Sequence, residues 1–134
     1  MSMKRVLSTM LPGSVIALSC LVQLRALADD ALLIGDVSRG KTLYQSCEAC
    51  HSVDQNDVGP KHRGVVGRLA GSVSDYVYSD ALKKSGITWT ETTLNRWLID
   101  PSAMVSGTKM FFRIDSAQSR ADIIAFLKEQ TTAK

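Results

Sequence analysis

The chain has 134 residues, which suits one domain. Hydrophobic residues make up 45% of it and charged residues 22%, a balance that argues against a disordered chain or a fibre. Its formal net charge of +3 comes from three bases in the first 28 residues, because thirteen bases and thirteen acids follow them. That neutral remainder lacks the positive excess of a nucleic-acid-binding protein.

Residues 1–28 have the pattern of a secretory signal peptide. Lys4 and Arg5 precede a mostly apolar stretch, and the small residues Ala26 and Ala28 favour cleavage after Ala28. Four residues make the stretch a poor permanent anchor: Pro12, Gly13, Gln23 and Arg25. We expect a mature domain over 29–134, exported to the periplasm, without a stable membrane span. The alternatives are an uncleaved anchor helix and lipoprotein processing at Cys20.

The first element of the expected domain is a helix from Asp36-Val37-Ser38 to about Cys50, which Asp36 or Ser38 can cap. The stretch 52–75 is rich in glycine and polar residues and predicts loops. A short helix is expected over Ser79–Ser85, ended by Gly86.

The next helix begins after Thr90, with Glu91 in its first turn, and stops at Asp100-Pro101. A loop is expected over 102–115 and a final helix over 116–130. No stretch alternates between apolar and polar residues for long enough to predict a sheet. The fold class is therefore all-α. Short helices and long loops make a thin core, which a large apolar cofactor would complete.

The segment Cys47-Glu48-Ala49-Cys50-His51 has the signature of covalent haem attachment. The spacing puts two thiols about one turn apart, to match the two vinyl groups of a porphyrin, and the histidine follows at once to ligate iron. A thioredoxin-like pair needs a βαβ setting, and a zinc site needs four suitable ligands. A disulfide between Cys47 and Cys50 would close only a very small loop.

An iron that only carries electrons needs a second axial ligand besides His51. Met104 and Met110 are the candidates on the C-terminal side. The residues alone leave both open, and either methionine is also an ordinary core residue.

Several segments occur in an order more specific than the haem motif alone. They are Gly35 through Gly40 with Tyr44, Gly59-Pro60, Gly64 through Arg68, Tyr78 through Ala81, Gly86 through Trp89, Gly107 through Met110, and Arg120 through Lys128. Together they resemble the class I c-type cytochrome family, in particular its small bacterial periplasmic monohaem members. The resemblance covers essentially the whole mature chain.

This resemblance implies the class I cytochrome c fold, with short helices and loops around one covalent haem c. It implies that His51 is the proximal and Met110 the distal iron ligand. It also implies further haem contacts: Pro60 accepting a hydrogen bond from His51, Tyr78 and Trp89 bonding a propionate near Arg68, Trp97 near the methionine sulfur, and Phe112 over the exposed edge. Gly40 and Tyr44 are expected to pack on Ile123 and Phe126.

Three features depart from the family pattern. The segment from His51 to Pro60 is short, Trp97 replaces a frequent tyrosine, and Ser106 replaces a frequent proline. We expect the remaining histidine, His62, to lie on the proximal loop as a surface residue and not as a second iron ligand.

The resemblance implies a monomeric one-electron carrier, not an enzyme, whose redox partners dock at the exposed haem edge. We expect four bases around that edge: Lys41, Lys61, Lys109 and Arg113. Two alternatives are a dedicated electron-acceptor subunit of a dehydrogenase and a haem enzyme with an open iron site.

Overall fold

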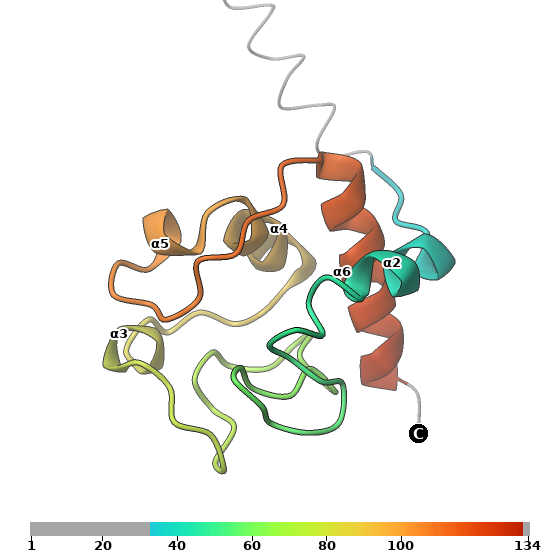
Figure 1. The fold of residues 1–134 in the computed structure, drawn as a ribbon. Helices are drawn as coiled ribbons and strands as arrows, with labels where there is room; N and C mark the ends of the chain where they lie inside the picture. The colour runs from blue at the N-terminus through green and yellow to red at the C-terminus, as the bar shows by residue number, and fades with distance from the viewer. Residues whose placement is uncertain (1–32, 133–134) are drawn as a thin grey trace, which may run out of the picture. The chain divides into compact units, whose positions relative to one another are not determined.

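The computed structural model describes residues 33–132, so the predicted signal peptide lies outside the described residues. Within this range the chain forms five helices: α2 (Val37–Tyr44), α3 (Asp80–Lys83), α4 (Glu91–Ile99), α5 (Pro101–Met104) and α6 (Ala117–Thr132) (Figure 1). The one β-bridge in the described part joins Leu69 and Thr88. The predicted all-α class is confirmed.

Helix α2 is shorter than predicted. Asp36 caps it by accepting a hydrogen bond from the Arg39 N–H, but the α-helix ends at Tyr44 and not near Cys50. Beyond Tyr44 the N–H groups turn to carbonyls three residues back, as in the 2.8 Å bond from Cys47 N to Tyr44 O. These tighter turns keep the chain coiled up to the cysteines without continuing the α-helix.

Both middle helices are present, the predicted start after Thr90 is confirmed, and α3 is shorter than the predicted span 79–85. Ser79 accepts from the Leu82 N–H at the start of α3, and Thr90 accepts from the Thr93 N–H at the start of α4. Both caps are short-range interactions between neighbouring residues, and this explains why the sequence predicts the one at Thr90.

Helix α5 lies where the sequence predicted only a loop. Asp100 ends α4 and also caps α5, because its carboxylate accepts a 3.0 Å hydrogen bond from the Ala103 N–H. Pro101 occupies the first position of α5, where a backbone N–H would have no acceptor within the helix, so its absence costs nothing. The pair that stops one helix therefore starts the next.

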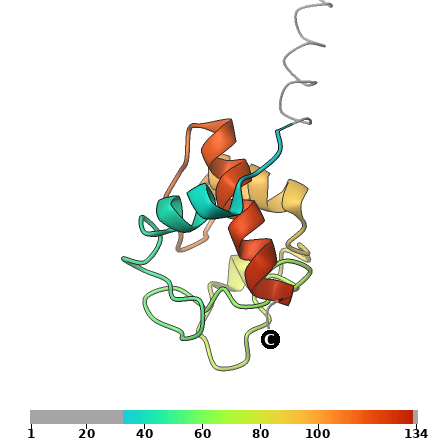
Figure 2. The same ribbon diagram turned by 90° about the vertical axis from the view of Figure 1, so that its right-hand side faces the viewer.

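Helices α2 and α6 cross at close range, as Figures 1 and 2 show from two directions. A Cβ atom on Gly40 would lie 2.0 Å from the Asp122 carbonyl oxygen, so only glycine fits at the crossing. The Tyr44 ring packs on Phe126 with centroids 5.0 Å apart. The predicted contact between the two terminal helices is confirmed at these residues.

The carboxylate of Asp122 on α6 ties down the start of α2. It accepts hydrogen bonds from the Asp36 N–H at 2.7 Å and from Arg39 Nε at 2.9 Å. Arg39 Nη2 adds a third at 3.1 Å, and the Gln118 amide adds a fourth at 2.9 Å. Asp122 is 2% exposed, so this is a buried carboxylate whose donors are all in place.

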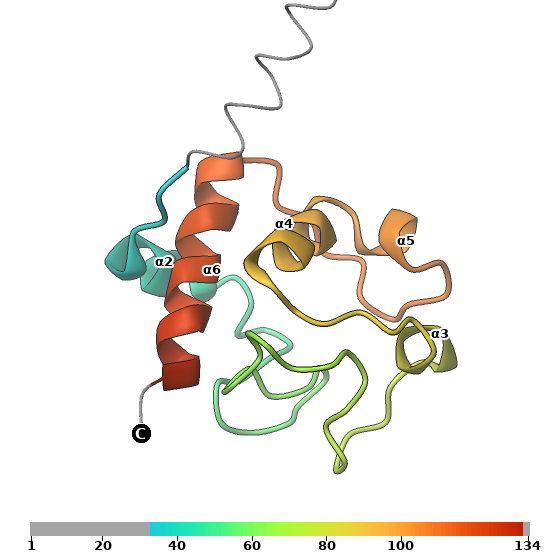
Figure 3. The ribbon, with the colours of Figure 1, turned by 180° about the vertical axis from the view of Figure 1, so that it is seen from behind.

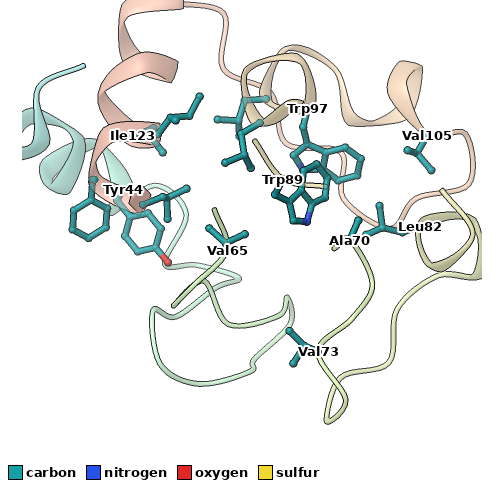
Figure 4. Close-up of a cluster of buried hydrophobic side chains, with 14 of the residues drawn as sticks. Tyr44, Val65, Ala70, Val73, Leu82, Trp89, Trp97, Val105 and Ile123 are labelled. Atoms are coloured by element: carbon teal, nitrogen blue, oxygen red, sulfur yellow. The ribbon is translucent and has the colours of Figure 1, made fainter. Parts of the chain in front are cut away.

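The core continues away from this crossing toward α4. Trp89 and Trp97 lie together inside it, edge to face, with ring centroids 5.1 Å apart (Figure 4). Seen from behind, α3 and α5 lie on the side of the domain away from α2 and α6 (Figure 3). Each helix within residues 33–132 is too short or too polar to cross a bilayer.

Candidate functional site

The cysteine motif follows α2 on a run of tight turns. Cys47 is partly buried, Cys50 is exposed, and both are free thiols. Burial raises the pKa of the Cys47 thiol. The His51 N–H donates to the Cys47 carbonyl at 2.9 Å, so the two thiols and the imidazole belong to one compact segment.

The His51 ring is held in one tautomer. Its Nδ1 lies 2.8 Å from the Pro60 carbonyl oxygen, which can only accept, so Nδ1 carries the proton and donates. Gly59 lies directly against the ring, since a Cβ there would be 2.2 Å from Cε1 of His51. Burial lowers the pKa of His51. The outcome is a neutral imidazole whose Nε2 lone pair is available to a metal.

His62 is not the surface residue that the sequence predicted. Its ring is half-buried and stacks on the His51 ring, with centroids 4.1 Å apart and planes 20° from parallel. Its Nδ1 shares a 2.9 Å hydrogen bond with the Tyr44 hydroxyl. Burial, with the charges of His51 and Arg68, keeps the pKa of His62 well below its usual value. No local signal predicts this contact, because Tyr44 and His62 are far apart in sequence.

The structure distinguishes the two candidate methionines. The indole N–H of Trp97, whose ring packs on Trp89, donates to the sulfur of the partly buried Met110 at 3.1 Å. Met104 instead lines a cavity of about 470 Å³ together with Ser85 and Ser106. Of these two methionines, Met110 is the one whose sulfur is oriented by a polar donor.

The residues expected at the propionate come from separate segments. Tyr78 and Trp89 are both buried, and burial raises the pKa of the Tyr78 phenol, with the nearby Arg68 charge opposing it. The Arg68 guanidinium donates to the Lys61 carbonyl at 2.8 Å and to the Arg63 carbonyl at 3.0 Å.

The aromatic residues after Met110 are open to solvent. Phe112 is 44% exposed and Phe111 is 83% exposed. Both sit at the end of the loop that carries Met110, which is where the exposed haem edge was expected.

Two of the four predicted docking bases have carboxylate partners. Lys61 Nζ lies 3.4 Å from Asp75, and the Arg113 guanidinium lies 2.8 Å from Asp100. The Lys109 ammonium donates to the Val77 carbonyl at 3.1 Å. Lys41 is exposed on α2.

The donor set fits one cofactor class. Among residues 33–132 no three His, Cys, Asp or Glu side chains gather closely enough to hold a metal ion by themselves. Two neighbouring free thiols, an oriented imidazole and an oriented thioether instead suit haem c, in which the porphyrin supplies the other four ligands.

Comparison with known proteins identifies a family. The model of the cytochrome c family matches residues 37–131. Cytochrome c2 of Rhodomicrobium vannielii is 45% identical over 104 residues, which are 75% of this chain and 83% of that protein. The structure of cytochrome cH from Methylobacterium extorquens is 47% identical with a TM-score of 0.69, covering 71% of this chain and 99% of its own. The structure of ferricytochrome c2 from Rhodopseudomonas palustris is 33% identical with a TM-score of 0.68, covering 72% of this chain and 99% of its own.

Proposed function

Because the chain belongs to the cytochrome c family, we propose that His51 and Met110 are the two axial ligands of its haem iron. The protein is an electron carrier and not an enzyme, and its cofactor is covalently attached haem c. When bound, haem c supplies the one-electron couple of its iron.

The bond between His51 Nδ1 and the Pro60 carbonyl is the observation that carries this assignment. It fixes the tautomer and leaves Nε2 as the only ring nitrogen with a free lone pair. On the other side, the Trp97 N–H orients the Met110 sulfur. Two soft or borderline donors, each held by one hydrogen bond, support a closed six-coordinate iron rather than an open site.

Cys47 and Cys50 are the proposed points of covalent attachment. Each thiol would hold the haem by a thioether bond: its sulfur would bond to one carbon of a vinyl group, and the thiol hydrogen would go to the other carbon. Both cysteines are free, and their place on tight turns beside His51 supports this role.

Arg68, Tyr78 and Trp89 are the proposed partners of a buried propionate. Tyr78 and Trp89 can donate hydrogen bonds to a carboxylate, and the Arg68 charge offsets it. Phe112 is proposed to cover the haem edge, where its partial exposure suits a boundary between cofactor and solvent.

The setting is proposed from the sequence outside the described residues. Cleavage after Ala28 would release residues 29–134 as a periplasmic monomer that exchanges electrons with protein partners at the haem edge. A dedicated subunit of one dehydrogenase is the alternative, and size exclusion of the native material separates the two.

The test is the absorption spectrum of the ferric holoprotein and of two variants. We expect a low-spin spectrum with the methionine-to-iron charge-transfer band. Met110→Ala removes the band and lowers the potential, while Met104→Ala leaves both intact.

Loss of the band in Met104→Ala alone would overturn the ligand assignment. A high-spin wild-type protein would instead favour the enzyme with an open site. Attachment is checked separately, because haem retained in acid-acetone must be lost when Cys47 and Cys50 are both replaced by alanine.

A further inference from the structure

His62 contacts the proposed iron ligand His51 ring to ring. Its ring lies over the His51 ring, 4.1 Å between centroids and 20° from parallel. The two histidines therefore stand side by side on the same side of the site, while the Met110 sulfur belongs to the Trp97 environment. A flat ring stacked on another restricts how the second ring can turn.

Three contacts hold His62 in place. Its backbone N–H donates to the Ser52 carbonyl at 3.0 Å, next to His51 in sequence. Its ring Nδ1 shares the 2.9 Å hydrogen bond with the Tyr44 hydroxyl. Arg68 binds the carbonyls of the residues on either side of His62, at 2.8 and 3.0 Å. The loop and the ring are thus fixed independently.

Tyr44 gives this arrangement a rigid anchor. It is 1% exposed and packs on Phe126 at the crossing of α2 and α6, 5.0 Å between ring centroids. Its hydroxyl points from α2 toward the loop that follows the motif (Figure 4). The position of His62 is therefore tied to the crossing of the terminal helices.

The hydrogen bond to Pro60 restrains the His51 ring only partly. The rotation in question is about the line that runs from the proposed iron bond at Nε2 across the ring. Nδ1 lies close to that line, so a hydrogen bond at Nδ1 exerts little torque against the rotation. A ring stacked on the face resists the same rotation across the whole width of the imidazole. The two contacts are complementary.

We propose that Tyr44 and His62 form a positioning pair that sets the rotation of the His51 ring about its bond to iron. This inference rests on the proposed ligation by His51. His62 is a positioning residue: it acts through His51, and Tyr44 acts through His62.

The test uses ferric holoprotein carrying Tyr44→Phe, His62→Leu, or both. The low-spin electron paramagnetic resonance g-values and the spread of the haem methyl proton shifts report the orientation of the axial ligand planes. We expect both single variants to change the methyl spread, His62→Leu by more. The double variant should add little to His62→Leu, because the hydroxyl has lost its partner there.

Ile124→Val is the matched control, since it removes one methylene from a buried side chain of α6. It should lower the melting temperature and leave g-values and methyl shifts unchanged.

Melting temperatures that fall in Tyr44→Phe and His62→Leu, with g-values and methyl shifts like the wild type, would reduce the pair to packing and overturn the inference. If His62→Leu yields no holoprotein, Tyr44→Phe decides alone, because it keeps the ring and removes only the hydroxyl. A wild-type spectrum without a low-spin histidine ligand would overturn the assignment of His51 itself, and this inference with it.

Discussion

Each of the two proposed ligand side chains is oriented by one hydrogen bond. His51 donates through Nδ1 to the Pro60 carbonyl, and the Met110 sulfur accepts. For Met110 the donor is the Trp97 indole, 3.1 Å from the sulfur. An indole N–H can donate and cannot accept, so the direction of this bond is fixed in a way that a phenol at the same place would not guarantee. The bond draws on a sulfur lone pair, and so weakens donation from that sulfur to the iron.

Trp97→Phe should therefore lower the reduction potential. Without the N–H the sulfur donates more strongly, which stabilises the ferric state relative to the ferrous state. If the free energy of this hydrogen bond differs by about 0.5–1 kcal/mol between the ferric and ferrous states, its loss lowers the one-electron potential by roughly 20–40 mV. Redox titration measures the shift.

The control for this prediction is Met104→Leu, which changes a methionine that has no donor on its sulfur among residues 33–132. Its potential should match the wild type. An unchanged or raised potential in Trp97→Phe would mean that the indole does not act on the sulfur.

At the scale of helices, the crossing of α2 and α6 is held by packing at Gly40 and by one buried carboxylate, Asp122. The hydrogen bonds from Arg39, helped by those from Asp36 and Gln118, lower the pKa of Asp122 to about 2. The carboxylate form thus favours the folded state. Its contribution is fully present above the ordinary carboxyl pKa and is lost as the pH falls toward 2.

Asp122→Asn should remove this acid sensitivity. At neutral pH we expect the variant to lose about 1–2 kcal/mol of unfolding free energy, a figure kept low because Arg39 is 59% exposed and solvent screens it. Between about pH 4 and 2 the difference from wild type should shrink. Denaturant unfolding at several pH values measures it.

Asp54→Asn is the comparison, because Asp54 pairs with Arg63 on the surface with 61% of its side chain exposed. It should change the stability little at any pH. A gap between Asp122→Asn and wild type that stays constant from pH 7 to 2 would contradict the linkage.

Ser106 lies in the loop that carries Met110, at a position where a proline would restrict the unfolded chain. The Ser106 N–H makes no hydrogen bond within residues 33–132, and Val105 before it is extended, with ψ of 96°. A proline at 106 would therefore cost no hydrogen bond within these residues, and Val105 lies outside the α region that a following proline disfavours. Ser106→Pro should stabilise the folded protein by about 0.4–1 kcal/mol by restricting the unfolded chain.

The same variant should raise the pH at which a lysine amine displaces the Met110 sulfur. Lys109 is the nearest candidate, and it must first leave the Val77 carbonyl. Loss of the charge-transfer band on pH titration measures the midpoint. Ser106→Ala is the control without added rigidity, and a midpoint equal in both variants would show that loop opening does not limit the exchange.

The sequence predicted what depends on neighbouring residues. The cap at Thr90 and the stop at Asp100-Pro101 are short-range features, and the structure contains them. It did not predict α5, because the same Asp100-Pro101 pair was interpreted only as an end. Contacts between distant segments were also missed, namely those from Tyr44 to His62 and from Arg39 to Asp122. The partners in each pair lie on separate segments and become neighbours only when the chain folds.

At the scale of the whole molecule, charge is balanced and locally paired. Residues 29–134 carry equal numbers of acids and bases. Of the four bases expected at the haem edge, Lys61 and Arg113 each lie beside a carboxylate. Lys41 and Lys109 are left as bases without a carboxylate hydrogen bond or ion pair in the described part of the chain. Long-range steering should therefore be present but modest.

Electron-transfer rates with an acidic protein partner should fall as salt rises, with a shallow slope. Salt screens exposed charges over about 10 Å at 0.1 M, and only two unpaired bases contribute strongly at the proposed edge. Lys109→Glu should slow the second-order rate and flatten or reverse its dependence on salt, because it puts a negative charge next to Phe111 and Phe112.

Lys128→Glu is the matched control: it makes the same charge change on α6, where Lys128 pairs with Glu91. Stopped-flow rates across an ionic-strength series decide the matter. Equal slowing by both variants would assign the effect to net charge, and rates indifferent to salt and to Lys109→Glu would show that association depends on the exposed aromatic residues and not on these bases.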